Sequence, residues 1–228
     1  MIQNIQHIFD ILFPRKCPLC GKILMDGEAV HTQCLQALKH TEQHLLVDNN
    51  TEELFGSNPH FCRGMAYLFV HKHSLESELL HALKFRNRPE IGSAVGRQLA
   101  QVANEVGWFD TMDVLMPVPL HRRRYRQRGY NQSEWIARGI QQVTGLPIDT
   151  EHLVRVRNNP MQSMNRNGSR EKNVRHIFEV NHPEELFRQH ILLVDDMITT
   201  GATLRSCMEA MREVRGAKFS VIAIGRAR

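Results

Sequence analysis

The stretch 191–205, ILLVDDMITTGATLR, constrains the fold of this chain more than any other part of the sequence. It opens with four apolar residues, and a short run of this composition is typical of a strand buried on both faces of a parallel sheet. Asp195 and Asp196 follow the run, then a loop rich in threonine, and residues 204–214 have a helical pattern. This order predicts a strand–loop–helix unit with polar groups at the carboxyl end of the strand.

The loop after the two carboxylates has the groups that bind a phosphate. A helix start offers unpaired N–H groups and a partial positive charge, and glycine lets the backbone approach an anion closely. The carboxylates would repel a phosphate, so we expect them to face sugar hydroxyls or a hard cation such as Mg²⁺. A plain turn with a threonine N-cap would have no use for them. A 5-phosphoribosyl ligand fits the whole set, with its phosphate at Thr199, Thr200, Gly201, Ala202 and Thr203.

The segment 192–203 closely resembles the PRPP-binding motif of type I phosphoribosyltransferases. In that family the acidic pair holds the ribose 2′ and 3′ hydroxyls, and the loop surrounds the 5-phosphate. The resemblance implies that Asp195 and Asp196 are the catalytic residues and that Mg²⁺ accompanies PRPP. It also implies an α/β fold, a type I phosphoribosyltransferase-like doubly wound parallel sheet, here with a small N-terminal zinc-binding segment.

Two pairs of metal-binding residues stand near the N-terminus. Cys17 and Cys20 are separated by two residues and followed by glycine, and His31 and Cys34 repeat the spacing. Three thiolates and one imidazole make a closed tetrahedral set, which predicts a structural Zn²⁺ whose binding is coupled to folding. Cys62 is an alternative fourth ligand in place of His31.

The remaining sequence predicts one α/β domain with a small appendage. Residues 1–13 have apolar residues at helical spacing without the features of a signal peptide, and no apolar run is long enough for a membrane span, so we expect a cytoplasmic protein. We expect a helix and zinc knuckle at 1–40, a polar linker at 41–62, and the phosphoribosyltransferase-like domain at 63–228. Strands are expected at 63–70, 113–120, 177–180 and 219–224, and helices at 74–85, 91–106 and 133–144.

Basic and polar residues follow the strand expected at 113–120. The net charge of the chain is +5, and five arginines fall between positions 122 and 128. Such a cluster indicates an anionic partner, unless it is only a solvated charged surface. The segment after the first core strand of a phosphoribosyltransferase binds pyrophosphate, which implies that role for Pro119, Leu120, Arg128, Asn131 and Gln132. The long polar stretch 153–178 is expected to form a mobile flap over the ligand, with Gln162, Arg170 and Asn173.

The chain as a whole, over about residues 12–228, resembles the ComF family of competence-associated proteins. The shared pieces include the cysteine pairs, Leu83-Lys84-Phe85, Pro117-Val-Pro-Leu120, Arg128-Gly-Tyr-Asn-Gln132 and the PRPP motif. His31 is a departure, since this family commonly has cysteine there. The resemblance implies handling of imported single-stranded DNA together with other DNA-uptake proteins. We expect the DNA to contact the basic segment and nearby aromatic residues, namely Lys84, Arg122, Arg123, Arg124, Arg126, Tyr125 and Tyr130.

Three functions stay open at this point. The first is a PRPP-binding protein that acts in DNA uptake. The second is an enzyme that transfers a phosphoribosyl group from PRPP to an amine or a base, although no base-recognition motif is evident. The third is a zinc-stabilised interaction module with a vestigial pocket.

Overall fold

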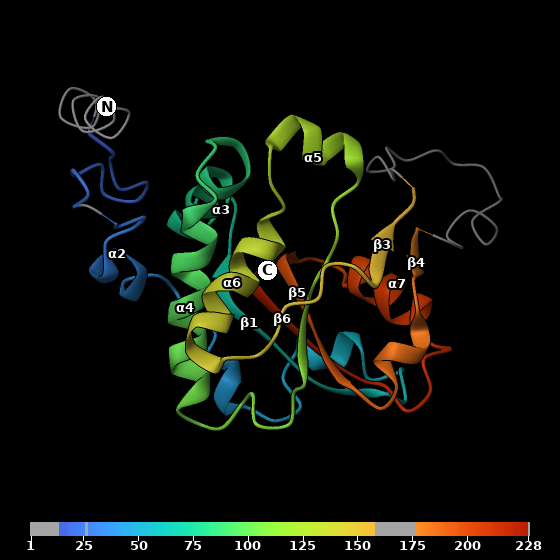
Figure 1. Ribbon diagram of the computed structural model, residues 1–228. Helices are drawn as coiled ribbons and strands as arrows, with labels where there is room; N and C mark the ends of the chain where they lie inside the picture. Colours follow the sequence, from blue (N-terminus) through green and yellow to red (C-terminus); the bar gives the residue numbers. More distant parts are fainter. Residues whose placement is uncertain (1–13, 26, 158–176, 228) are drawn as a thin grey trace, which may run out of the picture.

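A four-stranded parallel sheet forms the centre of the computed structural model, which describes residues 14–25, 27–157 and 177–227 (Figure 1). The strands are β1 (Phe61–Val70), β2 (Val114–Pro117), β5 (His190–Ile198) and β6 (Lys218–Ala227), in the order β1-β6-β5-β2. Each strand is parallel to its neighbours. The predicted α/β class is confirmed, and the helix expected at 1–13 lies outside the described residues.

The sheet is covered on both faces, which explains the continuous apolar run in β5. Leu192 and Val194 belong to a core shared with α3 (Leu75–Phe85), α4 (Glu90–Asn104) and α6 (Gln132–Thr144). Ile191 and Leu193 belong to a second core shared with α7 (Ala202–Ala210). Successive strand residues point to opposite faces, so a strand between two helical layers must be apolar at every position (Figure 1).

Helices α4 and α6 pack with their backbones in close contact. A Cβ atom at Gly96 would lie 2.3 Å from the carbonyl oxygen of Ile136, and one at Gly139 would lie 2.2 Å from that of Ser93. Any larger residue would push the helices apart. This close packing fixes α6, whose first residues reach the carboxyl end of β5.

The edge of β1 that does not pair with β6 is covered by residues 39–54, most of which were predicted as a linker. Backbone hydrogen bonds of 2.9 and 3.0 Å join Thr41 N to Tyr67 O and Phe69 N to Lys39 O. The segment includes two short helices, η1 (Gln43–Leu45) and η2 (Glu52–Leu54), and its Gln43 side chain accepts a hydrogen bond from Ala66 N. The polar residues of this segment supply the partners that an edge strand needs.

Several predicted bounds differ from the structure. β5 continues through both carboxylates, where Asp195 pairs with Ala223 of β6, so the carboxylates lie within the strand and not after it. β2 ends at Pro117 because the prolines cannot continue the ladder. The arginine-rich stretch forms a short helix, α5 (Arg122–Arg128), above the carboxyl ends of the strands (Figure 1).

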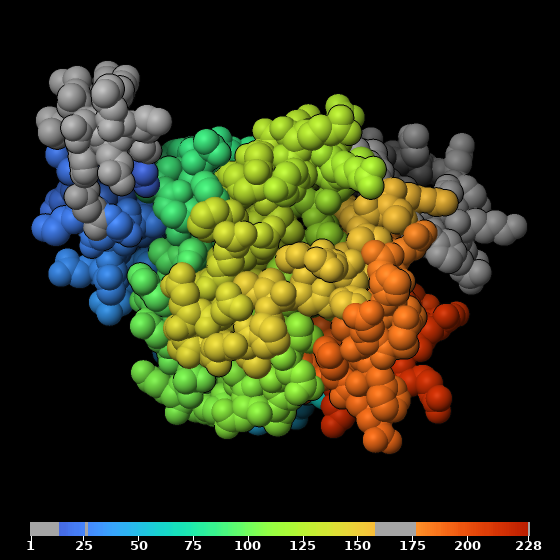
Figure 2. All heavy atoms as spheres, viewed as in Figure 1, coloured from blue at the N-terminus to red at the C-terminus, as the bar shows by residue number. Residues whose placement is uncertain are grey.

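The smaller elements lie around this frame. A two-stranded antiparallel sheet, β3 (Leu153–Arg155) and β4 (Phe178–Val180), precedes η3 (Pro183–Leu186). The cysteine-rich segment, with α2 (Thr32–Gln36), stands at one side of the molecule beside α3 and α4 (Figures 1 and 2). Within the described ranges, the longest apolar stretches in helices fall short of what a membrane crossing requires.

Candidate functional site

Asp196, near the carboxyl end of β5, is held by two other elements. Its Oδ1 lies 2.9 Å from Nζ of Lys84, which stands in the last turn of α3. Its Oδ2 accepts a hydrogen bond of 3.2 Å from Nε2 of Gln132, the first residue of α6. We call these three side chains the Asp196 clamp. Both carboxylate oxygens therefore have a partner within the chain, and the direction of the carboxylate is fixed.

The neighbouring Asp195 is in a less favourable environment for a charge. Its Oδ1 accepts a hydrogen bond of 2.8 Å from the backbone N–H of Asp196 and a longer one, of 3.4 Å, from Oγ of Ser133. Burial, followed by the charge of Asp196, raises the pKa of Asp195 from its ordinary value of 3.8 to about 7. A carboxyl group that titrates near neutral pH in this position is typical of a functional site.

A hydrogen bond between Tyr130 and Leu83 holds the last turn of α3 next to the clamp. The Tyr130 hydroxyl donates a hydrogen bond to the carbonyl oxygen of Leu83, the residue before the clamp lysine. Tyr130 is only 6% exposed, so the prediction that it stacks on DNA is wrong. Its ring belongs to the core shared by α3 and α6, and this contact cannot be predicted from local patterns because residues 83 and 130 are far apart along the chain.

Asn131 positions the start of α6. Its Oδ1 accepts a hydrogen bond from the backbone N–H of Ser133, as an N-cap does, and its Nδ2 donates to the carbonyl oxygen of Val118 after β2. Asn131 was predicted to bind pyrophosphate, and the structure gives it these two contacts while Gln132 joins the clamp. Pro119 and Leu120, also expected at pyrophosphate, lie partly buried between β2 and α5.

The loop between β5 and α7 has the geometry of an anion cradle. Gly201 has φ +74° and stands at the N-cap of α7, where no side chain caps the first turn. A Cβ atom at Gly201 would lie 3.1 Å from the Phe55 ring and from the Arg205 guanidinium. Glycine is therefore required here both for the left-handed backbone and for space. The threonines at 199, 200 and 203 are exposed beside it.

The arginines of α5 divide into an exposed group and one inward residue. Arg122, Arg123, Arg124 and Arg126 are exposed, and Tyr125 is 49% exposed. Arg128 is partly buried, with its guanidinium 5.4 Å from the centre of the Phe85 ring. Burial lowers the pKa of Arg128 and the charge of Asp196 opposes this change, which places Arg128 near the clamp.

The residues that the structure places at this site differ in part from those predicted for it. Gln162, Arg170 and Asn173, the expected flap residues, lie outside the described part of the chain. Lys84 was assigned to a DNA surface, whereas the structure places it in the Asp196 clamp. Ser133 and Arg155 were not assigned, although Ser133 contacts Asp195 and the charge of Asp195 acts on Arg155. Ser133 directly follows Gln132, which belongs to a piece that resembles the ComF family, and this position could have indicated that Ser133 is part of the site.

The cysteine-rich segment brings four metal-binding groups together. Ligand atoms of Cys17, Cys20, His31 and Cys34 all lie within 4.8 Å of one another. His31 Nδ1 is 3.3 Å from the Cys20 sulfur, and its Nε2 lies 3.2 Å from the Ile23 carbonyl oxygen. A carbonyl partner on the second ring nitrogen is typical of a metal-binding histidine.

This Cys₃His cluster fits a structural metal such as zinc. Four soft or borderline donors at this separation form a closed tetrahedral set. Burial alone would raise the pKa of the Cys17 thiol, but backbone hydrogen bonds from His31 and Cys20 outweigh it and lower the pKa to about 6. Cys62 lies on β1, exposed, with its sulfur near the carbonyl oxygen of His60. The structure therefore favours His31 as the fourth ligand.

The comparisons with known proteins agree with this geometry. A phosphoribosyl transferase domain model matches residues 133–226. The chain is 33% identical over 131 residues to the DNA utilization protein YhgH of Salmonella typhimurium, covering 56% of this chain and 57% of that protein. It is 26% identical over 155 residues to competence protein F of Haemophilus influenzae, covering 66% and 68%. It is 27% identical over 200 residues to competence protein ComFC of Bacillus subtilis, covering 86% and 71%.

The chain is therefore similar to proteins of the ComF family and has a phosphoribosyltransferase-like fold. It spans about 57% of the length of the YhgH relatives that it matches. The matched domain model begins at Ser133 and includes β5, residues 199–203, which we call the Thr/Gly loop, and α7. Lys84 and the Cys₃His cluster lie before the residues that this model covers.

A loop next to the clamp also contacts the cysteine-rich segment of this chain. Arg88, between α3 and α4, donates hydrogen bonds of 3.2 and 3.0 Å to the carbonyl oxygens of Lys16 and Ala29. Glu90 pairs with Arg88 and, at 3.8 Å, with Arg15. The segment 84–90 therefore connects the carboxylate site to the metal-binding segment.

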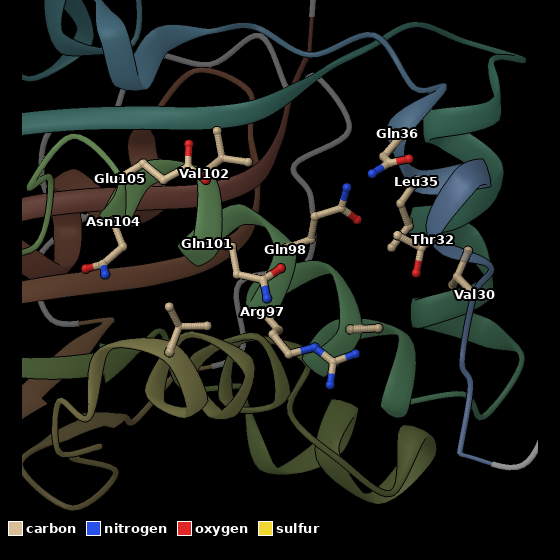
Figure 3. A pocket seen from close by; sticks show the side chains of 12 residues that line it. Val30, Thr32, Leu35, Gln36, Arg97, Gln98, Gln101, Val102, Asn104 and Glu105 are labelled. Carbon is tan, nitrogen blue, oxygen red and sulfur yellow. The ribbon is translucent and has the colours of Figure 1, made fainter.

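A cavity of about 500 Å³ lies between α2 and α4 (Figure 3). Val30 and Leu35 line it from the cysteine-rich segment, and Arg97, Gln101 and Glu105 line it from α4. Its lining includes none of the residues of the Asp196 clamp or the Thr/Gly loop. We therefore treat the carboxyl end of β5, and not this cavity, as the candidate functional site.

Metal content tests the Cys₃His cluster. We expect about one zinc ion per chain in protein purified without added metal. Cys34→Ser should lose most of the ion and unfold at a lower temperature, because three donors no longer close the site. Cys62→Ser is the matched control and should keep both properties. The measurement is elemental analysis beside thermal unfolding; a metal-free chain that is fully folded would contradict the assignment.

The raised pKa of Asp195 makes a stability prediction. Between pH 3.8 and about 7 the native chain binds a proton that the unfolded chain has released, so the free energy of unfolding falls as pH rises through this window. Asp195→Asn removes the titration and should be more stable than the wild type at pH 8, by an amount on the order of 2–4 kcal/mol. The difference should disappear at pH 4.

Denaturant unfolding at a series of pH values measures this difference. Asp110→Asn, an exposed carboxylate before β2, is the control and should follow the wild type. An Asp195→Asn variant with the same pH dependence as the wild type would show that Asp195 ionises normally.

Proposed function

We propose that this chain is a PRPP-binding protein of the phosphoribosyltransferase fold that handles imported single-stranded DNA in the cytoplasm during natural transformation. One observation carries the first part: the Asp196 clamp stands directly before a glycine-centred loop that leads into the uncapped start of α7. The names of the relatives, DNA utilization protein and competence protein, support the second part. We expect other DNA-uptake proteins among its partners.

The proposed ligand is arranged along the carboxyl end of β5. The 5-phosphate contacts Thr199–Thr203, where the first-turn amides of α7 and the threonine hydroxyls donate hydrogen bonds. The ribose hydroxyls contact Asp195 and Asp196. Arg128, near Asp196, faces the pyrophosphate group together with the segment at Pro119 and Leu120. Mg²⁺, when bound with PRPP, neutralises the charge of the pyrophosphate.

The proposed DNA surface is the exposed side of α5. Four exposed arginines and Tyr125 provide the charge and the ring that bind single-stranded nucleic acid without sequence preference. Since α5 stands above the carboxyl ends of the strands, this surface lies at the same end of the sheet as the Thr/Gly loop (Figure 1).

Ligand-induced stabilisation tests the PRPP site. PRPP with Mg²⁺ at about 100 times its dissociation constant should raise the free energy of unfolding by roughly 2.7 kcal/mol. Asp196→Asn should lose most of this gain, since the ribose hydroxyls lose a charged partner, and Asp110→Asn should keep it. Pyrophosphate release with candidate amines and bases, measured in the same samples, distinguishes a transferase from a binding protein. No stabilisation of the wild type would favour the interaction module with a vestigial pocket.

Salt-dependent DNA binding tests the α5 surface. Replacing Arg122, Arg123 and Arg124 by alanine should weaken binding of a single-stranded oligonucleotide and reduce the slope of log K against log salt by about 2. A control variant with alanine at Arg97, Arg212 and Arg215 loses the same charge at exposed positions away from α5. Fluorescence anisotropy at several salt concentrations gives both slopes. An equal loss of affinity in the two variants would show that DNA binding depends on the net charge of the chain and not on the surface of α5.

A further inference from the structure

The Asp196 carboxylate has a resident cation. Lys84 Nζ lies 2.9 Å from Oδ1, and the two side chains are 24% and 14% exposed. Lys84 is not a free surface lysine, because the hydrogen bond from Tyr130 to Leu83 and the ring contact between Arg128 and Phe85 fix the residues on both sides of it. An ion pair that is partly removed from water is stronger than one at the surface.

The two aspartates already have cationic side chains of this chain as neighbours. Lys84 contacts Asp196, the charge of Asp196 acts on Arg128, and that of Asp195 acts on Arg155. A divalent cation bound to Asp196 would stand next to the Lys84 ammonium and would be repelled by it. The apo site is therefore better suited to an uncharged diol with an anionic phosphate than to a free metal ion.

Gln132 gives a second observation that points to a hydroxyl-bearing ligand. Its Nε2 is used by Asp196, but its Oε1 is buried and has no hydrogen-bond partner among the described residues. The residue itself is 2% exposed. A buried acceptor without a partner is costly, and a hydroxyl donor from a sugar bound at the clamp would satisfy it after a small rotation of the amide.

We propose that Lys84 takes the place of a divalent cation at Asp196, so that the ribose 5-phosphate half of the ligand binds without metal. Mg²⁺ is then needed only for the pyrophosphate half of PRPP. This inference rests on the proposed function and extends it, because it predicts affinity for phosphoribosyl compounds that lack pyrophosphate. Lys84 acts as a positioning residue through Asp196.

Calorimetric titration with ribose 5-phosphate tests the inference. The zinc-loaded full chain is used in Mg²⁺-free buffer without a chelator, and again with millimolar Mg²⁺. The wild type should bind with about the same affinity in both buffers. Lys84→Gln should bind at least about tenfold more weakly without Mg²⁺, equivalent to ~1.4 kcal/mol, and Mg²⁺ should restore part of the loss. Lys84→Arg should remain close to the wild type.

A metal readout separates this role from a purely structural one. Electron paramagnetic resonance of Mn²⁺ without ligand should show that Lys84→Gln gains a bound ion that the wild type and Lys84→Arg lack, because the carboxylates are left without their cation. Lys218→Gln, which removes an exposed charge at the amino end of β6, is the matched control and should gain none. Thermal unfolding without ligand verifies that each variant is folded.

The contradicting results are distinct. If PRPP with Mg²⁺ stabilises the wild type but ribose 5-phosphate binds only when Mg²⁺ is present, the role of Lys84 is wrong and the proposed function stands. If Lys84→Gln binds ribose 5-phosphate like the wild type and gains no Mn²⁺, the inference is likewise wrong. If neither PRPP nor ribose 5-phosphate binds the wild type in any buffer, the proposed function fails and the inference with it.

Discussion

Two adjacent carboxylates within a central parallel strand are the constraint on which the rest of this structure depends. Burial disfavours both charges, and Asp195 responds with a pKa raised to about 7. Asp196 is instead stabilised by a lysine from α3 and an amide from α6. The glycine contacts between α4 and α6, the Asn131 cap and the Tyr130 hydrogen bond all hold these partners in place. Two adjacent carboxylates buried at this cost are typical of a functional site, and they lie next to the glycine turn at the start of α7.

The metal-binding segment is joined to the same framework. Arg88 contacts the carbonyl oxygens of Lys16 and Ala29 on the cysteine-rich side, and Lys84 contacts Asp196 on the sheet side. The apolar residues of the cysteine-rich segment pack into the same core as α3 and α4, and a metal ion bound in the Cys₃His cluster would stabilise the segment further.

The sequence predicted features that depend on local patterns. The apolar run at 191–194 predicted a doubly covered strand, the cysteine spacing predicted the cluster of metal-binding groups, and the order of residues in 191–214 predicted the strand–loop–helix unit of β5 and α7. The sequence could not predict contacts between residues that are distant along the chain. Lys84 was assigned to a DNA surface for its charge, whereas its partner is Asp196. Tyr130 was expected to be accessible, but it fills the core between two helices.

The choice between His31 and Cys62 shows the same limit. Spacing alone favoured His31 without excluding Cys62, and the structure favours His31 because β1 carries Cys62 away from the other sulfurs. The sequence also did not determine the secondary structure of residues 122–128, since a run of arginines fits a loop or a helix face. His121 and Gly129 cap the two ends of α5.

The most direct test of the central claim is a crystal structure of the full chain with PRPP and Mg²⁺. The account predicts the 5-phosphate within hydrogen-bond distance of the backbone amides of 199–203 and the ribose hydroxyls at Asp195 and Asp196, with Lys84 still paired to Asp196. Density for the phosphate on the α5 arginines or in the cavity between α2 and α4, with the carboxylates unoccupied, would contradict it.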